Sequence, residues 1–363
     1  MKYKLKDIGT ITTGKTPSKK IVGAYGKKIN FLTPRDLNGQ RYSEYTERRL
    51  SLKGIECLKN YEVIPPSISV SCIGSDMGKV VFNKTPIVTN QQLNSISNIR
   101  KDIDPLYLYY LLYNKRILLK FMGSDRGSTM PILSKREFGN LEFEFPNLKT
   151  QKSISSRLDS LDKKIEVNSR INDNLLELMD NLFYNFFPQI NVGDDLIGSF
   201  IQNYDRFRKP LSKEQRSAIS GKYRYIGAAS VMDYINKYNF DGIYLLLGED
   251  GTVIDNKGYP ILQYVFGKFW PNNHTHVLKG KNISTEWLYL FFRQRKVLNI
   301  VTGAVQKKIS QKNLNSLKFS HPNKEDYLKF NEIIQPLFSD IRIRIKENKR
   351  LHQLKQELLK QYF

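Results

Sequence analysis

The chain has 363 residues, of which 40% are hydrophobic and 12% aromatic, so it can bury more than one core and is not a disordered tail. Its 58 Lys and Arg residues against 35 Asp and Glu give a formal net charge of +23. This excess favours a polyanionic partner, nucleic acid before an anionic membrane, although a basic protein without such a partner remains the alternative.

Other composition features narrow the class of protein. Two cysteines are too few for a disulfide scaffold, and the first residues lack the apolar core of a signal peptide. No run approaches the roughly 18 uninterrupted apolar residues of a membrane span. We therefore expect a soluble cytoplasmic protein with no membrane partner.

The first part of the chain is predicted to form short strands separated by turns. Gly39, Gly74 and Gly78 lie at the breaks. Pro105 suits an early helix position, because Pro lacks the N–H that the first helical turn leaves unused. The strand-like segments are residues 29–32, 67–73, 80–82 and 87–89, and residues 105–120 look helical.

Residues 9–16 match the phosphate-loop pattern G-x-x-x-x-G-K-[ST]. We reject this interpretation, because only eight residues precede the pattern and Pro17 follows it at once, so the required strand and helix are missing. The segment is better interpreted as a basic, hydroxyl-rich loop whose lysines hold nucleic-acid phosphates. An ordinary solvated turn is the alternative.

From residue 154 the apolar residues follow the 4-3 spacing of a coiled coil. Five heptads with few breaks predict a long helix, which we place at residues 150–188. One seam row is Ile154, Leu161, Asn168, Leu175 and Leu182, and the other is Leu158, Ile165, Asn172, Met179 and Phe186.

The second part of the chain again predicts strands, at residues 223–226, 243–247 and 261–266, followed by a helix at 285–300 that Thr285 could cap. Residues 255–257 fit the D-x-K end of a nuclease site, but no partner acid is evident. His274 and His276 are two potential metal ligands, whereas a structural zinc site needs four. We rank contact with bases or phosphates above metal binding, and plain loop packing above both.

A second long helix is predicted at residues 326–363. Pro336 predicts a kink, or a helix start near Leu337, because Pro clashes with the preceding turn. Its seam rows are Phe330, Leu337, Arg344, Leu351 and Leu358, and Ile334, Ile341, Asn348, Lys355 and Tyr362. Both helices are polar in mid-seam, so in an antiparallel pair these polar groups would meet and fix the register. Rotation of the same groups into solvent is the alternative.

The chain repeats itself. Residues 127–187 and 303–363 align without a gap at an offset of 176, whereas upstream of them identity is thin and the offset drifts. Such a repeat implies two similar units. In each unit we call the gapless part, which contains the long helix, the constant back, and the part upstream of it the variable front. Variable fronts on constant backs are expected if the two fronts bind different partners or sequences. We place two front domains at residues 1–149 and 189–325.

Some of the candidate contacts with DNA occupy similar places in the two copies: residues 126–128 and 306–308 precede the long helix, and residues 90–92 and 272–274 lie further upstream. Arg and Gln can read base edges with two hydrogen bonds, and Lys can hold phosphate, although an ordinary exposed surface is the alternative at each position. The candidates are Lys15, Thr16, Ser18, Lys19, Lys20, Arg35, Gln91, Gln92, Arg126, Ser128, Lys222, Arg224, Asn273, His274, Gln306, Lys307 and Lys308. The candidates for helix pairing are Leu161, Ile165, Asn168, Asn172, Leu175, Leu337, Ile341, Arg344, Asn348 and Leu351.

The order of these motifs resembles the specificity subunit of type I restriction–modification systems. LKDIG at residues 5–9 with TGKTPS at 13–18 is similar to the first box of that family, and IGSDMGKV at 73–80 to the second. Residues 165–187 resemble the end of its spacer helix. The resemblance covers essentially the whole chain, but the TGKTPS box is missing from the second copy at residues 198–200.

The resemblance implies an α+β fold: two β-rich target recognition domains joined by two long helices that form an antiparallel coiled coil. Each domain would read one half of a split double-stranded DNA sequence. The helices would set the spacer and dock adenine methyltransferase (modification) subunits, which use S-adenosylmethionine, and a motor-nuclease (restriction) subunit would join them. The chain itself would not be an enzyme and would need no cofactor or metal.

Two alternatives remain. The first is a protein-interaction scaffold with two β-rich modules on a coiled coil. The second is a stand-alone nuclease or methyltransferase, which is weaker because the catalytic boxes are missing.

Overall fold

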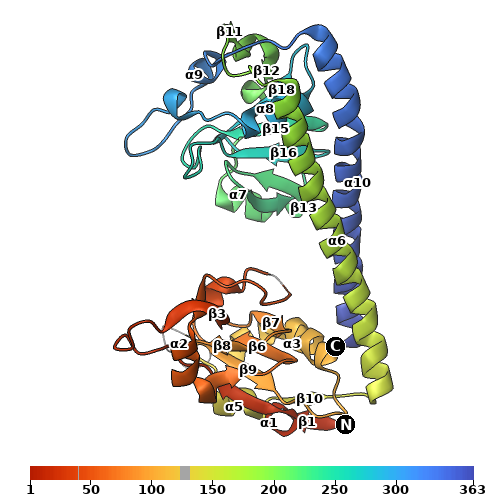
Figure 1. The fold of residues 1–363 in the computed structure, drawn as a ribbon. Coiled ribbons are helices and arrows are strands. Elements are labelled where there is room, and N and C mark those ends of the chain that lie inside the picture. The colour runs from red at the N-terminus through yellow and green to blue at the C-terminus, as the bar shows by residue number, and fades with distance from the viewer. Residues whose placement is uncertain (40, 123–130) are drawn as a thin grey trace. The chain divides into compact units, whose positions relative to one another are not determined.

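The computed structural model describes residues 1–39, 41–122 and 131–363. They form two compact units (Figure 1): unit 1 comprises Met1–Ile165 and Lys349–Phe363, and unit 2 comprises Glu166–Asn348. Each unit therefore contains part of both long helices. Within the described ranges, no helix is long and apolar enough to cross a membrane.

Unit 1 is built on two four-stranded sheets. The first has the order β2-β9-β6-β7 and the second the order β4-β3-β8-β5, and β1 pairs separately with β10. The strands are β1 (Lys2–Lys4), β2 (Thr10–Thr13), β3 (Tyr25–Leu32), β4 (Arg48–Leu50), β5 (Glu62–Val63), β6 (Ser67–Ser71), β7 (Val80–Asn83), β8 (Ile87–Thr89), β9 (Leu93–Ser97) and β10 (Glu142–Glu144). The helices are α1 (Leu5–Ile8), α2 (Leu52–Cys57), α3 (Pro105–Asn114), α4 (Arg116–Met122) and α5 (Lys135–Asn140).

Unit 2 repeats this plan. Its sheets have the orders β12-β18-β15-β16 and β14-β13-β17, and β11 pairs with β19. The strands are β11 (Asp195–Leu196), β12 (Ile201–Asn203), β13 (Ser220–Ile226), β14 (Val231–Ile235), β15 (Ile243–Gly248), β16 (Leu262–Phe266), β17 (Phe269–Pro271), β18 (Thr275–Gly280) and β19 (Lys318–Phe319). The helices are α7 (Lys213–Ala218), α8 (Thr285–Arg293) and α9 (Gln311–Asn315).

The two fronts share one topology although their sequences have drifted apart. In both, the four-stranded sheet of matching order is antiparallel throughout. In the other sheet, β3 pairs in parallel with β8 just as β13 pairs in parallel with β17. The duplication seen in the constant backs therefore extends to the whole of each unit.

A helix rich in aromatic residues covers the first sheet of each unit. In unit 1 the Asp104 carboxylate caps α3 by accepting from the Tyr107 N–H at 3.0 Å, and Pro105 occupies the predicted early position. In unit 2 the cap of α8 is Ser284 and not Thr285, because the Ser284 hydroxyl accepts from the Trp287 N–H at 3.1 Å.

The two predicted front helices are shorter than expected. The first is interrupted at Lys115, which separates α3 from α4. The second ends at Arg293, since the buried Val297 donates its N–H to the Gly258 carbonyl at 2.9 Å and the chain leaves the helix to reach it. Only a 3₁₀ turn, Leu298–Ile300, follows.

The constant back of each copy forms a helix of 39 residues, α6 (Leu148–Phe186) and α10 (Lys324–Tyr362). Both begin after a Pro-Asn pair. The Asn147 side chain accepts from the Thr150 N–H at 2.9 Å, and Asn323 from the Asp326 N–H at 2.8 Å. A side-chain acceptor at this position satisfies one of the helix's unpaired first N–H groups.

Pro336 does not start the second helix, so the predicted start near Leu337 is wrong. Pro336 lies inside α10 and is exposed, as is Glu332, whose carbonyl loses its usual N–H partner because Pro has no N–H. Burial of Ile334 and Phe338 on either side holds this stretch helical against the local cost of Pro.

The two long helices run antiparallel in each unit. In unit 1 the Arg157 guanidinium donates to the Tyr362 hydroxyl at 3.1 Å, and Leu158 shares a core with Leu359. In unit 2 the ring of Phe183 lies 5.6 Å from that of Phe330. The contacting face of α6 and α10 is called the seam below.

Candidate DNA-binding loops and helix seam

Two loops of unit 1 that carry predicted contacts lie against each other. The Thr16 hydroxyl donates to the Gln91 side-chain carbonyl at 2.7 Å, and the Lys15 N–H donates to the Thr89 carbonyl at 2.9 Å. A Cβ at Gly14 would lie only 2.1 Å from the Thr89 hydroxyl, so only glycine permits this approach. The first box thus brings its basic end, with the exposed Ser18, Lys19 and Lys20, to the loop that carries Gln91.

A polar hollow of about 630 Å³ joins three further segments of unit 1. Arg35 lines it from a 3₁₀ turn that Thr33 and Asp36 cap reciprocally, and Gln92 lines it from the loop before β9. Arg48 also lines the hollow, 5.3 Å from the Tyr25 ring, and the sequence prediction missed it. The only signal was a pair of arginines on a short strand.

The second box forms the turn between β6 and β7 and contributes Ser75 and Asp76 to that hollow. Gly74 and Gly78 have φ values of +87° and +89°, which favour glycine. A Cβ at Gly78 would also lie 2.4 Å from the Arg116 carbonyl, so the turn packs directly on the backbone of α4.

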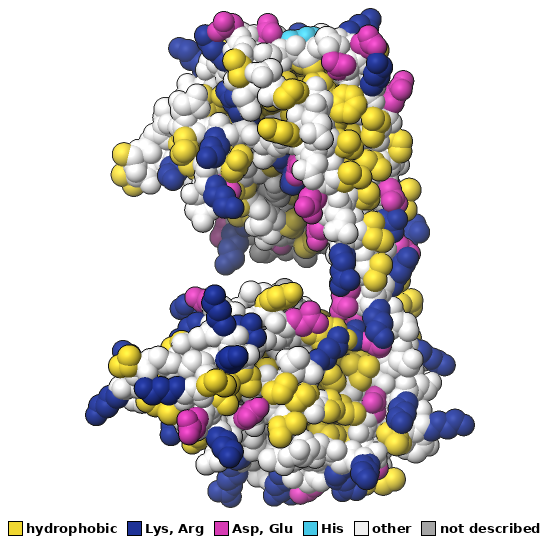
Figure 2. Space-filling model, viewed as in Figure 1, with side chains coloured by type: hydrophobic (Ala, Val, Ile, Leu, Met, Phe, Trp, Pro, Cys, Tyr) yellow, Lys and Arg dark blue, Asp and Glu magenta, His cyan; other side chains and the backbone are white. Residues whose placement is uncertain are grey.

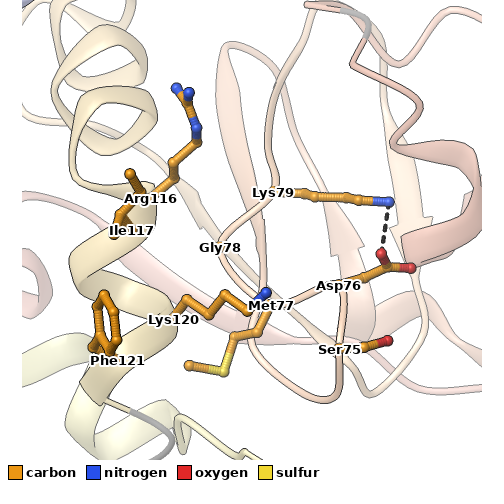
Figure 3. A pocket seen from close by; sticks show the side chains of 9 residues that line it. All are labelled: Ser75, Asp76, Met77, Gly78, Lys79, Arg116, Ile117, Lys120 and Phe121. Atoms are coloured by element: carbon orange, nitrogen blue, oxygen red, sulfur yellow. Dashed lines mark ion pairs between the residues drawn. The ribbon is translucent and has the colours of Figure 1, made fainter. Parts of the chain in front are cut away.

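A second hollow, of about 530 Å³, lies between this turn and α4 (Figure 3). Ile117 and Phe121 of α4 form one wall, and the turn with the Lys79–Asp76 ion pair, 3.0 Å long, forms the other. Arg126 and Ser128, two further predicted contacts, lie outside the described residues.

In unit 2 a tight turn after β15 holds two of the predicted loops. The Glu249 N–H donates to the His274 carbonyl, and the Gly251 N–H to the Lys307 carbonyl, both at 2.9 Å. Lys308 lies 3.6 Å from the Glu249 carboxylate. The predicted residues Asn273, His274, Gln306, Lys307 and Lys308 are all exposed on this surface. Lys and Arg side chains are spread over the visible face of each unit (Figure 2).

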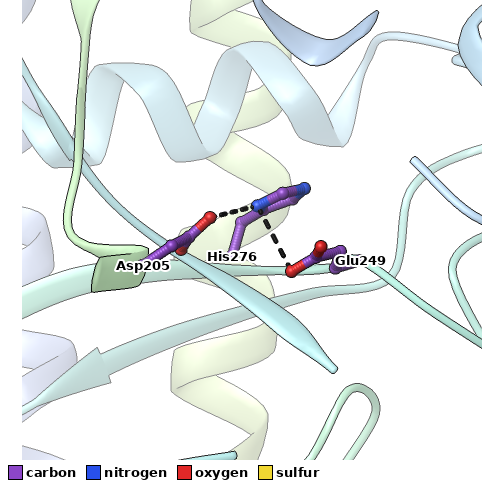
Figure 4. Close-up of side chains that lie close together, drawn as sticks. All are labelled: Asp205, Glu249 and His276. Carbon is purple, nitrogen blue, oxygen red and sulfur yellow. Dashed lines mark hydrogen bonds and ion pairs between the residues drawn. The ribbon is translucent and has the colours of Figure 1, made fainter. Parts of the chain in front are cut away.

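A buried histidine, His276, interacts with segments next to these loops (Figure 4). His276 Nδ1 lies 2.6 Å from the Asp205 carboxylate, and Nε2 lies 2.8 Å from the Ile309 carbonyl. Burial raises the pKa of Asp205, but hydrogen bonds from His276, from the Asn203 side chain and from a backbone N–H outweigh it, so the pKa lies below its ordinary value.

Asp205, Glu249 and His276 offer three ligand atoms within 4.8 Å of one another. However, both ring nitrogens of His276 face oxygen acceptors, and Arg208 donates to the Glu249 carboxylate at 2.6 Å and to the Thr275 carbonyl at 2.7 Å. The chain thus supplies the cation for these carboxylates itself. The arrangement shapes the loops and is poorly suited to a metal.

Other predicted positions lie apart from these loops. Arg224 donates to the Phe266 carbonyl at 2.9 Å, and burial lowers the pKa of its guanidinium. Lys222 is exposed near the start of β13. The loop that carries Asn273 contacts this strand at Ile226, whose carbonyl accepts from the Asn272 N–H, and Ile226 lies four residues or roughly 13 Å along the strand from Lys222. The Asp255 carboxylate accepts from the Lys257 and Tyr259 N–H groups and so shapes a turn, not a nuclease site.

The polar middle of the seam forms a hydrogen-bonded group in unit 2. The buried Asn168 donates to the Asn348 side-chain carbonyl at 2.9 Å and to the Glu347 carboxylate at 2.7 Å, and Arg344 approaches its carbonyl at 3.4 Å. The Asn172 Oδ1 is buried with no hydrogen-bond partner among the described residues. Of the apolar candidates, Ile341 is buried, and Leu161, Ile165, Leu175, Leu337 and Leu351 are half-buried.

The sequence prediction missed a buried ionic group in unit 1. The Lys355 ammonium donates to both carboxylate oxygens of Asp162, at 2.6 and 2.9 Å. Arg41 pairs with Asp159 and lies 3.6 Å from Asp162. Burial lowers the pKa of Arg41, but Tyr110, Tyr42 and Asp159 raise it more, so the guanidinium stays charged. The available signal was Lys355, which is a charged residue in a seam row.

Comparison with known proteins identifies the class. The family described as type I restriction modification DNA specificity domain matches residues 1–177 and again residues 198–356. Because the two matches cover most of the chain, the chain belongs to this family and carries two such domains. It is a specificity subunit of a type I restriction–modification system, and the resemblance noted from the sequence is confirmed.

Three relatives show how far the likeness extends. The MjaIX specificity subunit of Methanocaldococcus jannaschii is 26% identical over 93% of this chain and 86% of its own length. The HindI specificity subunit of Haemophilus influenzae is 30% identical over 49% of this chain and 39% of its own length. The crystal structure of the M. genitalium S subunit, at 16% identity, covers 100% of this chain and 96% of its own with a TM-score of 0.60, which shows the shared fold.

Proposed function

We propose that each unit reads one half of a split double-stranded DNA sequence through the loops described above. One observation carries this proposal: the same fold occurs twice with different side chains on corresponding loops. In the loop before β9 unit 1 presents Gln91 and Gln92, and in the corresponding loop before β18 unit 2 presents Asn273 and His274. Different base readers on one scaffold would recognise two different half-sites.

The helix pair would set the distance between the half-sites. A helix of 39 residues is about 58 Å long at ~1.5 Å per residue, and one turn of DNA measures about 34 Å. The helices are therefore long enough to separate two readers by more than one turn. The net charge of +23 supplies the phosphate contacts that position both readers.

The chemistry would come from partner subunits. We propose that adenine methyltransferase subunits, which use S-adenosylmethionine, dock on the helix pair, and that a motor-nuclease subunit joins them for cleavage. The complex would act in the cytoplasm, where the DNA is. Family membership does not favour the interaction scaffold, and the role of Asp255 in a turn removes the one nuclease motif.

The test is the methylation pattern of a cell that contains the full chain and its methyltransferase. We expect methylated adenines in a split sequence with a spacer of fixed length. A heptad of seven residues inserted at matching points of both helices, after Ile171 and after Ile345, adds about 10 Å. The spacer should then lengthen by about three base pairs at ~3.4 Å each.

The control is the same insertion after Ile171 alone. It shifts one helix against the other and breaks the Asn168–Asn348 contact, so it should destabilise the pair and not lengthen the spacer. An unchanged spacer after the matched insertion would contradict the ruler. A methylated sequence that is not split would contradict the two-reader proposal itself.

A further inference from the structure

One layer of the seam in unit 1 is ionic and buried. Asp162 and Lys355 face each other across the two helices, with only 10% and 9% of their side chains exposed. The Tyr110 hydroxyl donates to the Asp162 carboxylate at 2.8 Å, and the Lys355 ammonium lies 4.8 Å from the centre of the Tyr113 ring. Only the Asp162–Lys355 contact in this group joins the two long helices, because Tyr110 and Tyr113 come from α3.

The corresponding layer of unit 2 is apolar. At the repeat offset of 176, Phe338 takes the place of Asp162 and Met179 takes the place of Lys355. Both side chains are fully buried, and the Phe338 ring lies 5.0 Å from that of Tyr264. The duplicated chain has therefore kept two symmetric layers but given them opposite character.

We propose that this asymmetry makes the α6 helix accept α10 and reject a second copy of itself. In an antiparallel pair of two α6 helices, Asp162 of each copy would face Met179 of the other. In a pair of two α10 helices, Lys355 would face Phe338. A pair of two α6 helices would deprive Asp162 of the Lys355 ammonium and leave it with Tyr110 and Arg41 of its own copy, whereas a pair of two α10 helices would bury Lys355 without its carboxylate. Loss of a charged partner from a buried ionic group is unfavourable in both cases. The proposal does not depend on DNA reading.

Two other contacts of the seam would be kept in character by such self-pairing. Leu158 now shares a core with Leu359, and the counterpart of Leu359 in α6 is the equally apolar Phe183. Asn168 now meets Asn348, whose counterpart in α6 is Asn172, so an amide would still meet an amide. Of the contacts compared, only the Asp162–Lys355 contact would place a charge against an apolar side chain.

The test uses the folded full chain with a protease site inserted at the exposed Val192, between the two copies. Two preparations carry different N-terminal tags. They are mixed, cut and left to exchange, and the first tag is captured. We call residues 1–192 half A and residues 193–363 half B. Recovery of the second tag then measures pairing of half A with half A.

In the wild type, capture should recover half B and exclude the other half A by at least about thirtyfold, since each self-pair of half A contains two layers in which Asp162 has lost Lys355. The double variant D162F/K355M gives unit 1 the residues of unit 2. It should still hold half B, but it should now recover the second tag at a share comparable to that of half B. The variant M179L, which keeps its layer apolar, is the control and should behave as wild type.

Free exchange of half A with half A in the wild type would overturn the proposal, and so would continued exclusion in D162F/K355M. If that variant does not fold, the reversed pair D162K/K355D provides the second test. Half A of the wild type mixed with half B of the reversed chain places Asp against Asp, so their mutual capture should be lost. Retained capture would refute the proposal.

Discussion

Removing either partner of the Asp162–Lys355 pair should destabilise unit 1, but by unequal amounts. Asp162→Asn leaves the Lys355 ammonium without its carboxylate and also removes the negative charge 3.6 Å from Arg41. Lys355→Met leaves Asp162 with the Tyr110 hydroxyl and with Arg41 as a counter-ion. The asparagine variant should therefore be the less stable of the two.

The magnitudes follow from these remaining partners. A buried charge left without compensation costs about 3–5 kcal/mol, which we expect for Asp162→Asn. Loss of one partner from a group that keeps two others costs about 1–3 kcal/mol, which we expect for Lys355→Met. In a unit of about 180 residues, each kcal/mol shifts the Tm by about 2–4 °C, so Asp162→Asn should lower the Tm of unit 1 by about 6–20 °C.

The two units can be followed separately in one sample. Both tryptophans, Trp270 and Trp287, belong to unit 2, so their fluorescence reports its unfolding, whereas far-ultraviolet circular dichroism detects both units. The variants should move the dichroism transition of unit 1 more than the fluorescence transition. A loss of less than about 1 kcal/mol for Asp162→Asn, or a larger loss for Lys355→Met, would refute the reasoning.

Three further predictions concern other sites. Burial raises the pKa of Cys72 to about 12, whereas Cys57 is exposed. A thiol reagent at about pH 8 should therefore label Cys57 in the native protein and Cys72 only after unfolding. Labelling of both cysteines in the native protein would contradict this prediction. Lys307→Ala should weaken binding to all DNA sequences alike and reduce the slope of log binding constant against log salt concentration by about 0.9. Lys308→Ala should have a smaller effect, because Lys308 is already paired with Glu249. An unchanged slope for Lys307→Ala would exclude a phosphate contact. The pKa of Asp205 lies below its ordinary value of 3.8, so its stabilising effect is present above that pH and is lost as the pH falls through the folded-state pKa. Asp205→Asn should therefore destabilise unit 2 at neutral pH, and the difference from wild type, measured by tryptophan fluorescence, should vanish in acid. A difference in stability that stays constant with pH would contradict this assignment.

The sequence predicts the long helices well because their signal is local. The 4-3 spacing places them within two residues of α6 and α10, and the strands at 67–73 and 87–89 coincide with β6 and β8. Local rules fail where packing decides. Pro336 lies inside a helix because Ile334 and Phe338 are buried beside it, and the second front helix ends early because Val297 is drawn into the core.

The candidate sites were predicted in part, for the same reason. The repeat predicts that the loops carrying Gln91 and Lys307 are functional. In the structure the Gln91 loop lies beside Thr16, and the Lys307 loop is held by the same turn as His274. Pairing between distant residues has no local signal. Arg41 and Asp162 look like surface charges in the sequence, and only the fold shows that they are buried beside each other.

The most direct test of the central claim is an exchange of residues 1–149 for the corresponding domain of another specificity subunit. The full chain with this exchange is placed in a cell with its methyltransferase, and the methylated adenines are mapped. One half-site should change completely, while the other half-site and the spacer length stay as in the wild type. A change in both half-sites, or in neither, would contradict the claim that each unit reads its own half.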